Sequence, residues 1–479
     1  MLFNSLAFAV FLPIVFFAYW ALPTKYRSIL LLIASYYFYM SWNVKYVVLI
    51  LFTTIVSYLC GLGLEKYPKY KKAMIWIASI SCLSVLFLFK YFNFFFDTLS
   101  RVCAKVSIPF SPITLKLMLP VGISFYTFQT LSYVYDVYKN EVKAEKNFFL
   151  YAAFISFFPQ LVAGPIERTG NLLPQMKAEH TFHKEEAVWG LKLMAWGFFK
   201  KLVIADNLAV YVDQIFDDVR YYQGFALILA AVFFTLQIYC DFSGYSDIAI
   251  GTARLFDIKL MKNFDSPYFS ASVREFWQRW HISLSGWFRD YVYIPMGGSR
   301  KGKFRKFVNQ FMTMLVSGLW HGAAFTYIAW GALHGVYQIL EGLWPGKKKN
   351  SESEKGAVIW IKRILVFILA MLAWVLFRAQ SLSDAVYVYL HMLSGVSAVK
   401  TYFSEGIRIL GLWDISGILT LVIPLILLWI YDYVALTRDP IQCISRIKPV
   451  YRWIIYYAFL FLVLMLASFN AQEFVYFQF

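Results

Sequence analysis

The chain has 479 residues, of which 60% are hydrophobic and 15% are charged. Ordinary globular proteins are about 45–50% apolar and about 25% charged, so a soluble protein of this composition would be unable to cover its surface. With 60% apolar residues, 25 glycines and 5 cysteines, the composition also excludes a disordered chain, a collagen-like repeat and a disulfide scaffold. A polytopic membrane protein remains.

The formal net charge is +17, from 45 Lys and Arg against 28 Asp and Glu. In a membrane protein this excess indicates basic cytoplasmic loops beside anionic lipid headgroups, so we expect membrane lipids and no nucleic acid as partners. The cysteines are scattered and contain no CxxC pair, which predicts neither a metal site nor a disulfide framework. They are Cys60, Cys82, Cys103, Cys240 and Cys443.

The first 23 residues lack a basic n-region and a small-residue cleavage site, so they predict a spanning helix and not a signal peptide. A bilayer core needs about 20 apolar residues per helix, which predicts roughly 11–13 membrane helices in a single all-α domain, residues 1–479. Residues 308–343 are too long for one span and predict two helices or a re-entrant pair. The predicted segments are 5–22, 28–43, 46–64, 73–96, 117–137, 147–163, 187–205, 223–250, 308–343, 358–377, 412–435 and 453–470.

Short basic loops separate these segments and predict the membrane topology. They lie at 66–72, 299–306, 347–355 and 446–452. The positive-inside rule places them in the cytoplasm. Counting spans outward from 66–72 and from 347–349 then places both termini outside the cytoplasm.

The first polar stretch inside apolar sequence is SGLWHGAA (317–324), followed by Trp330 and His334. An ionisable group in a membrane segment tends to face a cavity and to mark function. The pKa of an unperturbed histidine lies close to 7, so His321 is a candidate proton acceptor, although a structural histidine bonded to a carbonyl is the common alternative. On one unbroken helix His334 would lie about 220° from His321, so the two would not share a metal unless the helix breaks.

The second stretch, 274–295, is too charged to span and predicts an amphipathic or re-entrant segment that lines a polar cavity. Glu275 and Arg279 are four residues apart and are expected to pair. Arg279 and His281 are candidates to hold a phosphate-bearing donor or to orient a substrate. An interfacial helix with snorkelling arginines explains the segment equally well.

The third stretch, 237–247, places Asp241 and Asp247 in an otherwise apolar helix. These carboxylates are candidates for general bases, cation sites or partners of buried arginines. For each one singly, structural pairing with Arg254 or Arg279 is the favoured interpretation. Two weaker signals accompany it: Lys200 and Lys201 are expected to snorkel at an interface, and the metal-like pair His180 and His183 is expected in a solvated loop.

Taken together these motifs resemble the membrane-bound O-acyltransferase superfamily, in particular its branch of alginate and peptidoglycan O-acetyltransferases. The resemblance runs in order along essentially the whole chain, and the combination of blocks is specific. The matching blocks are FLPIVFFAYWAL (11–22), YRSILLLIASYYFYMSW (26–42), FFPQLVAGPI (157–166), QIYCDFSGYSDIAIG (237–251), FWQRWHISLSGWFRDYVYIPMGGSR (276–300) and SGLWHGAAFTYIAWGALHG (317–335).

The resemblance implies a helix bundle around a transmembrane tunnel, with catalytic segments at about 237–343. It implies that His321 is catalytic and that His281 is the second histidine involved. The implied donor is acetyl-CoA, a substrate and not a resident cofactor, and the implied partner is an SGNH-type esterase or transferase outside the cytoplasm that modifies an envelope polysaccharide. A multi-pass protein of the bacterial cell membrane follows from this.

Acyl transfer from a thioester to a hydroxyl requires a base and stabilisation of a tetrahedral oxyanion. His321 is the expected base. His281, Trp or Ser side chains, or backbone N–H groups near Gly318 and Gly322 are candidates for the second task. We expect substrate-binding roles for Trp320, Arg279, Asp241, Asp247 and Ser317.

The tail 474–479, FVYFQF, resembles an aromatic-Tyr acyl-transfer motif of related envelope acylation systems. We therefore expect Tyr476 either to carry the acetyl group or to serve as an interfacial anchor. Two other functions remain as alternatives: a transporter or flippase for a lipid-linked sugar or acyl carrier, and an inactive scaffold for an esterase. The absence of a mirrored pair of interrupted helices argues against the transporter.

Overall fold

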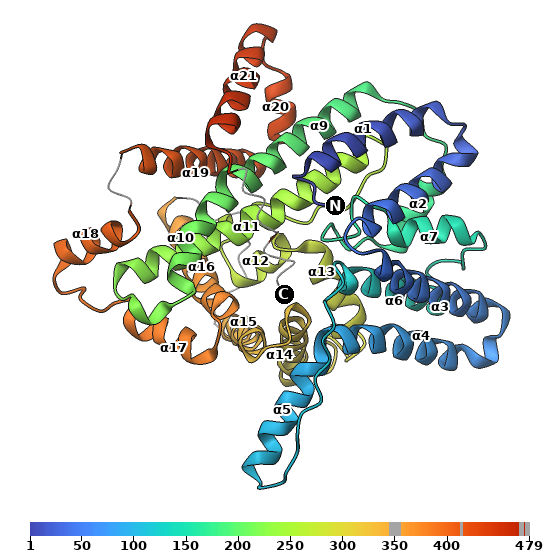
Figure 1. Ribbon diagram of the computed structural model, residues 1–479, viewed down its shortest axis with the longest axis horizontal. Coiled ribbons are helices and arrows are strands. Elements are labelled where there is room, and N and C mark those ends of the chain that lie inside the picture. The colour runs from blue at the N-terminus through green and yellow to red at the C-terminus, as the bar shows by residue number, and fades with distance from the viewer. Residues whose placement is uncertain (344–355, 412–414, 469–473, 475–479) are drawn as a thin grey trace. The chain divides into compact units, whose positions relative to one another are not determined.

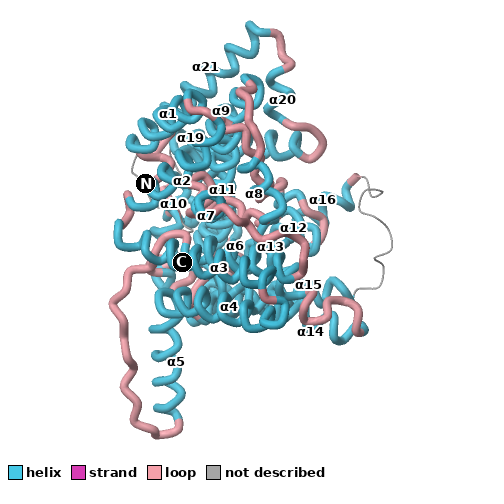
Figure 2. Tube along the Cα trace, turned by 90° about the vertical axis from the view of Figure 1, so that its right-hand side faces the viewer, coloured by secondary structure: helices cyan, strands magenta, loops and turns pink. Residues whose placement is uncertain are grey.

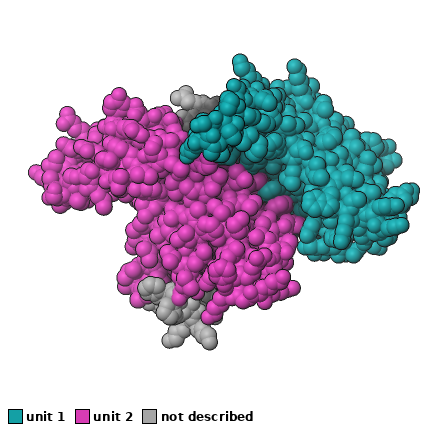
Figure 3. Space-filling view, turned by 90° about the horizontal axis from the view of Figure 1, so that it is seen from below, with its two compact units in different colours: residues 1–194, 248–261 teal, residues 195–247, 262–479 magenta. Residues whose placement is uncertain are grey.

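The computed structural model describes residues 1–343, 356–411, 415–468 and Phe474, and these residues form helices and loops without a strand (Figure 2). The chain divides into two compact units. Unit 1 comprises residues 1–194 and 248–261, and unit 2 comprises residues 195–247 and 262–479 (Figure 3). The predicted all-α class is confirmed.

Unit 1 contains the N-terminal helices (Figure 1). Its helices are α1 (Leu6–Ala21), α2 (Thr24–Met40), α3 (Val47–Lys66), α4 (Lys71–Leu86), α5 (Phe92–Lys105), α6 (Ile123–Tyr138), α7 (Phe148–Ser156), α8 (Thr169–Lys177) and most of α9 (Lys184–Phe198).

Close contacts at glycines hold the helices of unit 1 together. A Cβ on Gly61 of α3 would lie 2.6 Å from the ring of Tyr133 on α6. A Cβ on Gly190 of α9 would lie 2.6 Å from the carbonyl oxygen of Gly251, near the end of α11 (Phe225–Arg254). Small residues therefore allow the backbones to approach, as is common between membrane helices.

A π-helical turn, Phe87–Tyr91, continues α4 into α5, and the chain then returns along α5 in an extended segment (Figure 2). The Asn93 side chain bonds both the N–H and the carbonyl of Leu115, at 2.8 and 2.9 Å. This two-point contact fixes the return segment. Helix α6 then begins at Ile123, after Gly122, whose φ of +75° suits glycine.

Unit 2 contains the rest of the helices. It begins with the end of α9 and a π-helical segment, Phe199–Ala205, and includes α11 up to Asp247. The others are α10 (Asp206–Phe216), α12 (Val273–Arg279), α13 (Ile282–Phe288), α14 (Gly302–His321), α15 (Phe325–Leu343), α16 (Ala357–Arg378), α17 (Leu382–His391), α18 (Val399–Ile409), α19 (Ile415–Ala435), α20 (Pro440–Ser445) and α21 (Pro449–Leu466).

By length and composition, 6 helical segments of the described chain are able to cross a membrane. They are Val44–Lys66, Pro68–Lys105, Phe225–Arg254, Ala357–Arg378, Gly417–Ala435 and Pro449–Leu466, and the shorter Leu6–Ala21 is also apolar.

This number is smaller than the roughly 11–13 spans predicted because several apolar segments are not long regular helices. The segment 147–163 leaves the helix at Ser156, shortly before Pro159. The segment 187–205 carries three charged residues, Lys192, Lys200 and Lys201. The segment 308–343 is two helices, which confirms that prediction. The tunnel and the single-domain organisation stay predictions, and the basic cluster 347–349 lies outside the described residues.

Candidate active site

Helices α14 and α15 form an antiparallel hairpin with a close crossing near the WHG block. A Cβ on Gly318 would lie 2.2 Å from the carbonyl oxygen of Tyr327, and a Cβ on Gly331 would lie 2.3 Å from that of Met314. Gly318 therefore accommodates the opposite helix and not a ligand. Gly322 faces the ring of Tyr327, to which a Cβ would approach within 2.1 Å, and its extended backbone (φ −160°) ends α14.

His321 is the last residue of α14 and is 5% exposed. Its imidazole packs among aromatic rings, with centroid distances of 4.9 Å to Trp320, 5.0 Å to Trp330 and 5.3 Å to Phe377. The break at Gly322 returns the chain, so that His334 on α15 packs on the same Trp330 ring at 4.9 Å. The two imidazoles that an unbroken helix would separate are therefore neighbours of one indole.

His281 lies between the short helices α12 and α13, in the left-handed conformation (φ +44°, ψ +55°). Its side chain is 1% exposed, and its Nδ1 lies 2.9 Å from Oδ1 of Asn263. An amide oxygen only accepts, so Nδ1 donates and Nε2 holds the lone pair. Burial lowers the pKa of His281 to about 3, which keeps the imidazole neutral.

Asn263 orients His281 because its own amide is fixed on both sides. Its Nδ2 donates to Oγ of Ser246 at 3.1 Å, and its Oδ1 also accepts from Oγ of Ser283 at 2.9 Å. The backbone carbonyl of Asn263 accepts from the N–H of Ile282. Asn263 is 0% exposed, so this orientation does not depend on solvent.

Trp320 places the two predicted histidines at one site. Its ring centroid lies 4.9 Å from that of His321 and 6.2 Å from that of His281. Phe242 on α11 covers the other side of His281 at 4.6 Å, edge to face. The structure thus brings together His281, Trp320 and His321, which are separated by up to 40 positions in the sequence.

Arg279 makes the predicted pair with Glu275, with 2.9 Å between Nε and Oε1. Its guanidinium also donates to the carbonyl oxygen and the carboxylate of Asp265, at 3.1 and 3.4 Å. These bonds give Arg279 a structural role at the start of the segment that carries His281.

Asp241 and Asp247 pair with lysines and not with arginines, which corrects the prediction. Nζ of Lys201 lies 2.6 Å from Asp241 and 2.9 Å from Asp206, and Nζ of Lys200 lies 2.8 Å from Asp247. Arg254 pairs with Glu186 instead.

The interpretation of both lysines as snorkelling residues is wrong, since they are 4% and 1% exposed. The π-helical segment Phe199–Ala205 turns both consecutive side chains toward carboxylates of α11. π-Helical turns often occur at functional sites, and here the turn gives α11 its buried counter-ions.

Ser317, one turn before His321 on α14, borders a cavity of about 650 Å³ within unit 2. Arg274, Arg289 and Lys306 line this cavity together with one carboxylate, that of Glu341. Trp277 also lines it and donates through Nε1 to Nδ1 of His334 at 3.3 Å. A basic cavity therefore reaches the hairpin that carries His321.

Comparison with known proteins decides the family. Residues 34–383 match MBOAT, the membrane-bound O-acyltransferase family. The chain belongs to this family. It is an O-acyltransferase, and the buried His281–Trp320–His321 group lies within the matched region.

Three relatives of this acyltransferase illustrate the similarity. A Pseudomonas putida protein named "Probable alginate O-acetylase AlgI" is 40% identical over 82% of this chain and 80% of its own length. The Helicobacter pylori "Peptidoglycan O-acetyltransferase" is 34% identical over 83% of this chain and 81% of its own. The Streptococcus thermophilus "Teichoic acid D-alanyltransferase" is 30% identical over 58% of this chain and 72% of its own.

Tyr476, the predicted acyl carrier, lies outside the described residues. Phe474, two positions earlier, is 1% exposed. Its ring contacts that of Tyr245 on α11 at 4.8 Å, and Nζ of Lys201 lies 4.3 Å from the ring centroid. Phe474 is therefore buried beside the ion pairs of α11.

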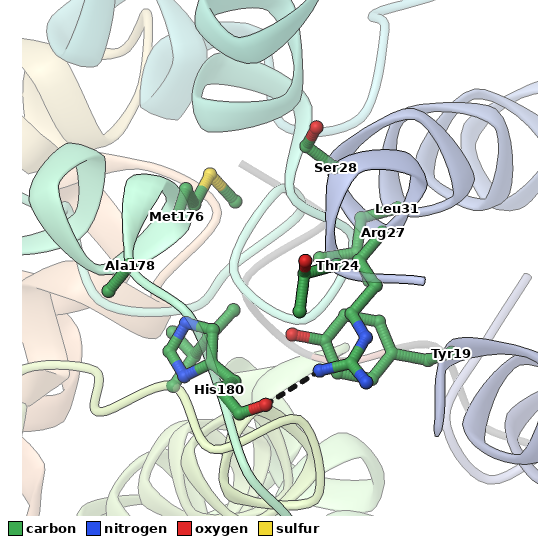
Figure 4. Close-up of a pocket in the computed structure, with 9 residues that line it drawn as sticks. Tyr19, Thr24, Arg27, Ser28, Leu31, Met176, Ala178 and His180 are labelled. Atoms are coloured by element: carbon green, nitrogen blue, oxygen red, sulfur yellow. Dashed lines mark hydrogen bonds between the residues drawn. The ribbon is translucent and has the colours of Figure 1, made fainter. Parts of the chain in front are cut away.

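A further polar cluster of the acyltransferase lies in unit 1. His180 bonds the carboxylate of Asp257 through Nδ1 at 3.0 Å, and its backbone carbonyl accepts from Arg27 at 2.7 Å (Figure 4). His183 lies 2.9 Å from the hydroxyl of Thr181. In the described part of the chain no three His, Cys, Asp or Glu side chains are arranged to hold a metal ion.

Sequence reasoning missed three residues of the site: Asn263, Trp330 as a shared contact, and Lys201 as the counter-ion of Asp241. Asn263 lies in a loop 18 positions from His281, where no periodic pattern relates the two. The sequence did contain a signal for Lys201. Two consecutive lysines inside an apolar segment require partners of opposite charge if they are buried.

Proposed function

We propose that the protein transfers an acetyl group from cytoplasmic acetyl-CoA across the cell membrane, for O-acetylation of an envelope polysaccharide. One observation carries this proposal: a buried histidine at a helix break, His321, lies one turn from a basic cavity of about 650 Å³. The names of two relatives, an alginate O-acetylase and a peptidoglycan O-acetyltransferase, support acetyl transfer to such polymers.

The cavity suits the donor by its charge and its position. Arg274, Arg289 and Lys306 line the cavity with the carboxylate of Glu341. Arg289 is also paired with Asp290, with 2.7 Å between Nε and Oδ1, so the lining keeps a smaller cationic excess, which favours a phosphate-bearing ligand. The basic segment 299–306 borders it, and by the positive-inside rule this segment is cytoplasmic. We therefore assign the cavity to coenzyme A, with the thioester toward Ser317.

The reaction requires one proton to move. His321 removes the proton of the acceptor hydroxyl while the hydroxyl oxygen attacks the thioester carbonyl. The tetrahedral intermediate then breaks its C–S bond, and His321 returns the proton to the leaving thiolate. His281, neutral and with its Nε2 lone pair fixed by Asn263, is assigned to orient the acceptor hydroxyl.

Tyr476 is proposed as the first acceptor, with His321 as its base, before the acetyl group passes to an SGNH-type partner outside the cytoplasm. The burial of Phe474 beside Tyr245 and Lys201 supports this, since the preceding part of the FVYFQF motif is held inside unit 2. The charge distribution along the sequence favours a C-terminus outside the cytoplasm, on the side of that partner.

The test is turnover of labelled acetyl-CoA by the full-length protein in liposomes, with and without the SGNH-type protein. We expect His321→Ala to abolish transfer while His391→Ala retains it, because His391 stacks on Tyr387 outside the site. Mass spectrometry of the trapped acyl-enzyme is expected to place the ester on Tyr476. Full activity of His321→Ala, or sugar translocation without acyl transfer, would overturn the assignment.

The Tyr476→Phe variant tests the proposed acyl carrier independently of the proposed base, His321. If this variant is inactive and unlabelled while wild-type protein carries the ester, the relay is supported. Full polymer acetylation by Tyr476→Phe, or an ester at another residue, would contradict the relay without affecting the role of His321.

A further inference from the structure

Two buried N–H groups lie beside His321 without an acceptor among the described residues. They are Nε1 of Trp330 and Nε2 of His334, on side chains that are 0% and 1% exposed. Buried donors in folded proteins are nearly always hydrogen-bonded, so each such group calls for an explanation.

The tautomer of His334 follows from its hydrogen bond with Trp277. Nε1 of Trp277 donates to Nδ1 of His334 at 3.3 Å, and an indole nitrogen is a donor only. In the neutral imidazole Nδ1 is therefore the acceptor and the proton is on Nε2. Trp277 thus turns His334 into a fixed N–H donor.

The two donors belong to the ring cluster of the proposed base. The Trp330 ring lies 4.9 Å from His334 and 5.0 Å from His321, at 73° and 86°. Trp277, which orients His334, lines the proposed donor cavity. The Trp330 ring therefore contacts both the proposed base and Trp277 of the cavity wall, at 5.0 and 5.6 Å, and His334 bonds the same Trp277.

Acyl transfer creates a negative oxygen where the thioester carbonyl was, and fixed N–H donors in a site without water are the usual means of stabilising it. Gly318 lies inside α14, where its backbone N–H donates along the helix, so this N–H is not available for the task.

We propose that Nε1–H of Trp330 and Nε2–H of His334 form the oxyanion hole for the acyl carbonyl oxygen. This inference rests on the proposed function. As the acceptor oxygen bonds to the carbonyl carbon, the electron pair of the C=O bond moves to the carbonyl oxygen and both N–H groups donate to it. When the C–S bond breaks, the carbonyl reforms, the thiolate takes the proton from His321, and the donors release the oxygen.

The first test removes the indole N–H of Trp330. Replacing Trp330 with 3-benzothienylalanine, or with phenylalanine in a simpler variant, is expected to lower kcat about 10²–10³-fold. The KM for acetyl-CoA is expected to change little, because the interaction strengthens in the transition state.

Trp196→Phe is the matched control for Trp330. Its Nε1 is also buried without an acceptor among the described residues, yet its ring packs on Phe199, Tyr431 and Phe459 and not on the histidines. We expect Trp196→Phe to retain wild-type kcat. Equal losses in the two variants would overturn the inference, since they would reflect packing alone.

The second test uses two amides at His334. Glutamine places an N–H close to the position of Nε2, whereas asparagine reaches only the position of Nδ1. We expect His334→Gln to retain at least about ten times more kcat than His334→Asn. Equal kcat in these variants, or wild-type kcat in Trp330→Phe, would overturn the oxyanion hole while acetyl transfer by wild-type protein still stood. Absence of transfer by wild-type protein would instead reject the proposed function.

Discussion

His281 donates through Nδ1 to Oδ1 of Asn263 over 2.9 Å, and this bond fixes which imidazole nitrogen holds the lone pair. The backbone of His281 is left-handed, a conformation that few residues other than glycine adopt. The position therefore combines a strained backbone with an oriented side chain, as is frequent at functional sites.

Asn263→Ala is expected to lower acyl transfer about 10–100-fold while the protein remains folded, because His281 loses the bond that selects its tautomer. The measurement is kcat with acetyl-CoA in liposomes. Asn207→Ala is the control, since the Asn207 amide donates to the backbone carbonyls of Val203 and Leu466 and orients no histidine. Unchanged kcat in Asn263→Ala would contradict a role for the tautomer.

Lys201→Met is expected to destabilise the protein by about 3–5 kcal/mol, because it leaves the buried carboxylates of Asp241 and Asp206 without their shared cation. Asp241→Asn should lower the free energy of unfolding by less, because Lys201 still pairs with Asp206 in this variant. Both are measured as unfolding free energies in detergent.

Lys262→Met provides the comparison for this ion pair. Lys262 pairs with Asp265, but its side chain is 59% exposed, so a loss of at most about 1 kcal/mol is expected. If Lys201→Met were as mild as Lys262→Met, the buried triad would not contribute to stability.

The sequence predicted the helical class, and it singled out the two histidines that the structure brings together at Trp320. Apolar runs identify helices, and His321 inside such a run is conspicuous without knowledge of its partners. His281 lies in a charged segment and was singled out by its motif and the family resemblance. The charge pair Glu275–Arg279 was also predictable, since its spacing of four is a property of one helix.

The sequence did not predict that His334 lies near His321, or that Lys200 and Lys201 are buried, because both depend on contacts between distant parts of the chain. The angle calculated between His321 and His334 assumed one helix, whereas the turn at Gly322 brings both imidazoles onto Trp330. Lys200 and Lys201 resembled interfacial residues because the local sequence does not show their partners, Asp247 and Asp241, which lie 40 or more positions later on α11.

Gly331→Ala is expected to destabilise the hairpin by about 1–3 kcal/mol and to lower activity further than its effect on folding. The added Cβ would lie 2.3 Å from the carbonyl oxygen of Met314, a backbone atom that is unable to move without separating α14 from α15. Separation would draw Trp330 away from His321.

Gly170→Ala is the control, because no atom lies within 4 Å of its Cβ position. Unfolding midpoints and kcat of the two variants check this, and equal values would refute the close crossing.

The free energy of unfolding of the protein is expected to decrease as the pH is lowered, because His281 titrates. The folded pKa is about 3, below the value of about 6.5 in an unfolded chain. Between these values the unfolded state binds more protons, so the contribution is fully present above about pH 6.5 and is lost as the pH falls toward 3. Unfolding midpoints in detergent at several pH values between about 7.5 and 5 measure the slope of stability against pH.

His281→Asn, which tolerates the left-handed backbone, should reduce this slope by up to about one proton, whereas His391→Asn should leave the slope as in wild type. An unchanged slope in His281→Asn would show that His281 is protonated, or exposed, in the native state.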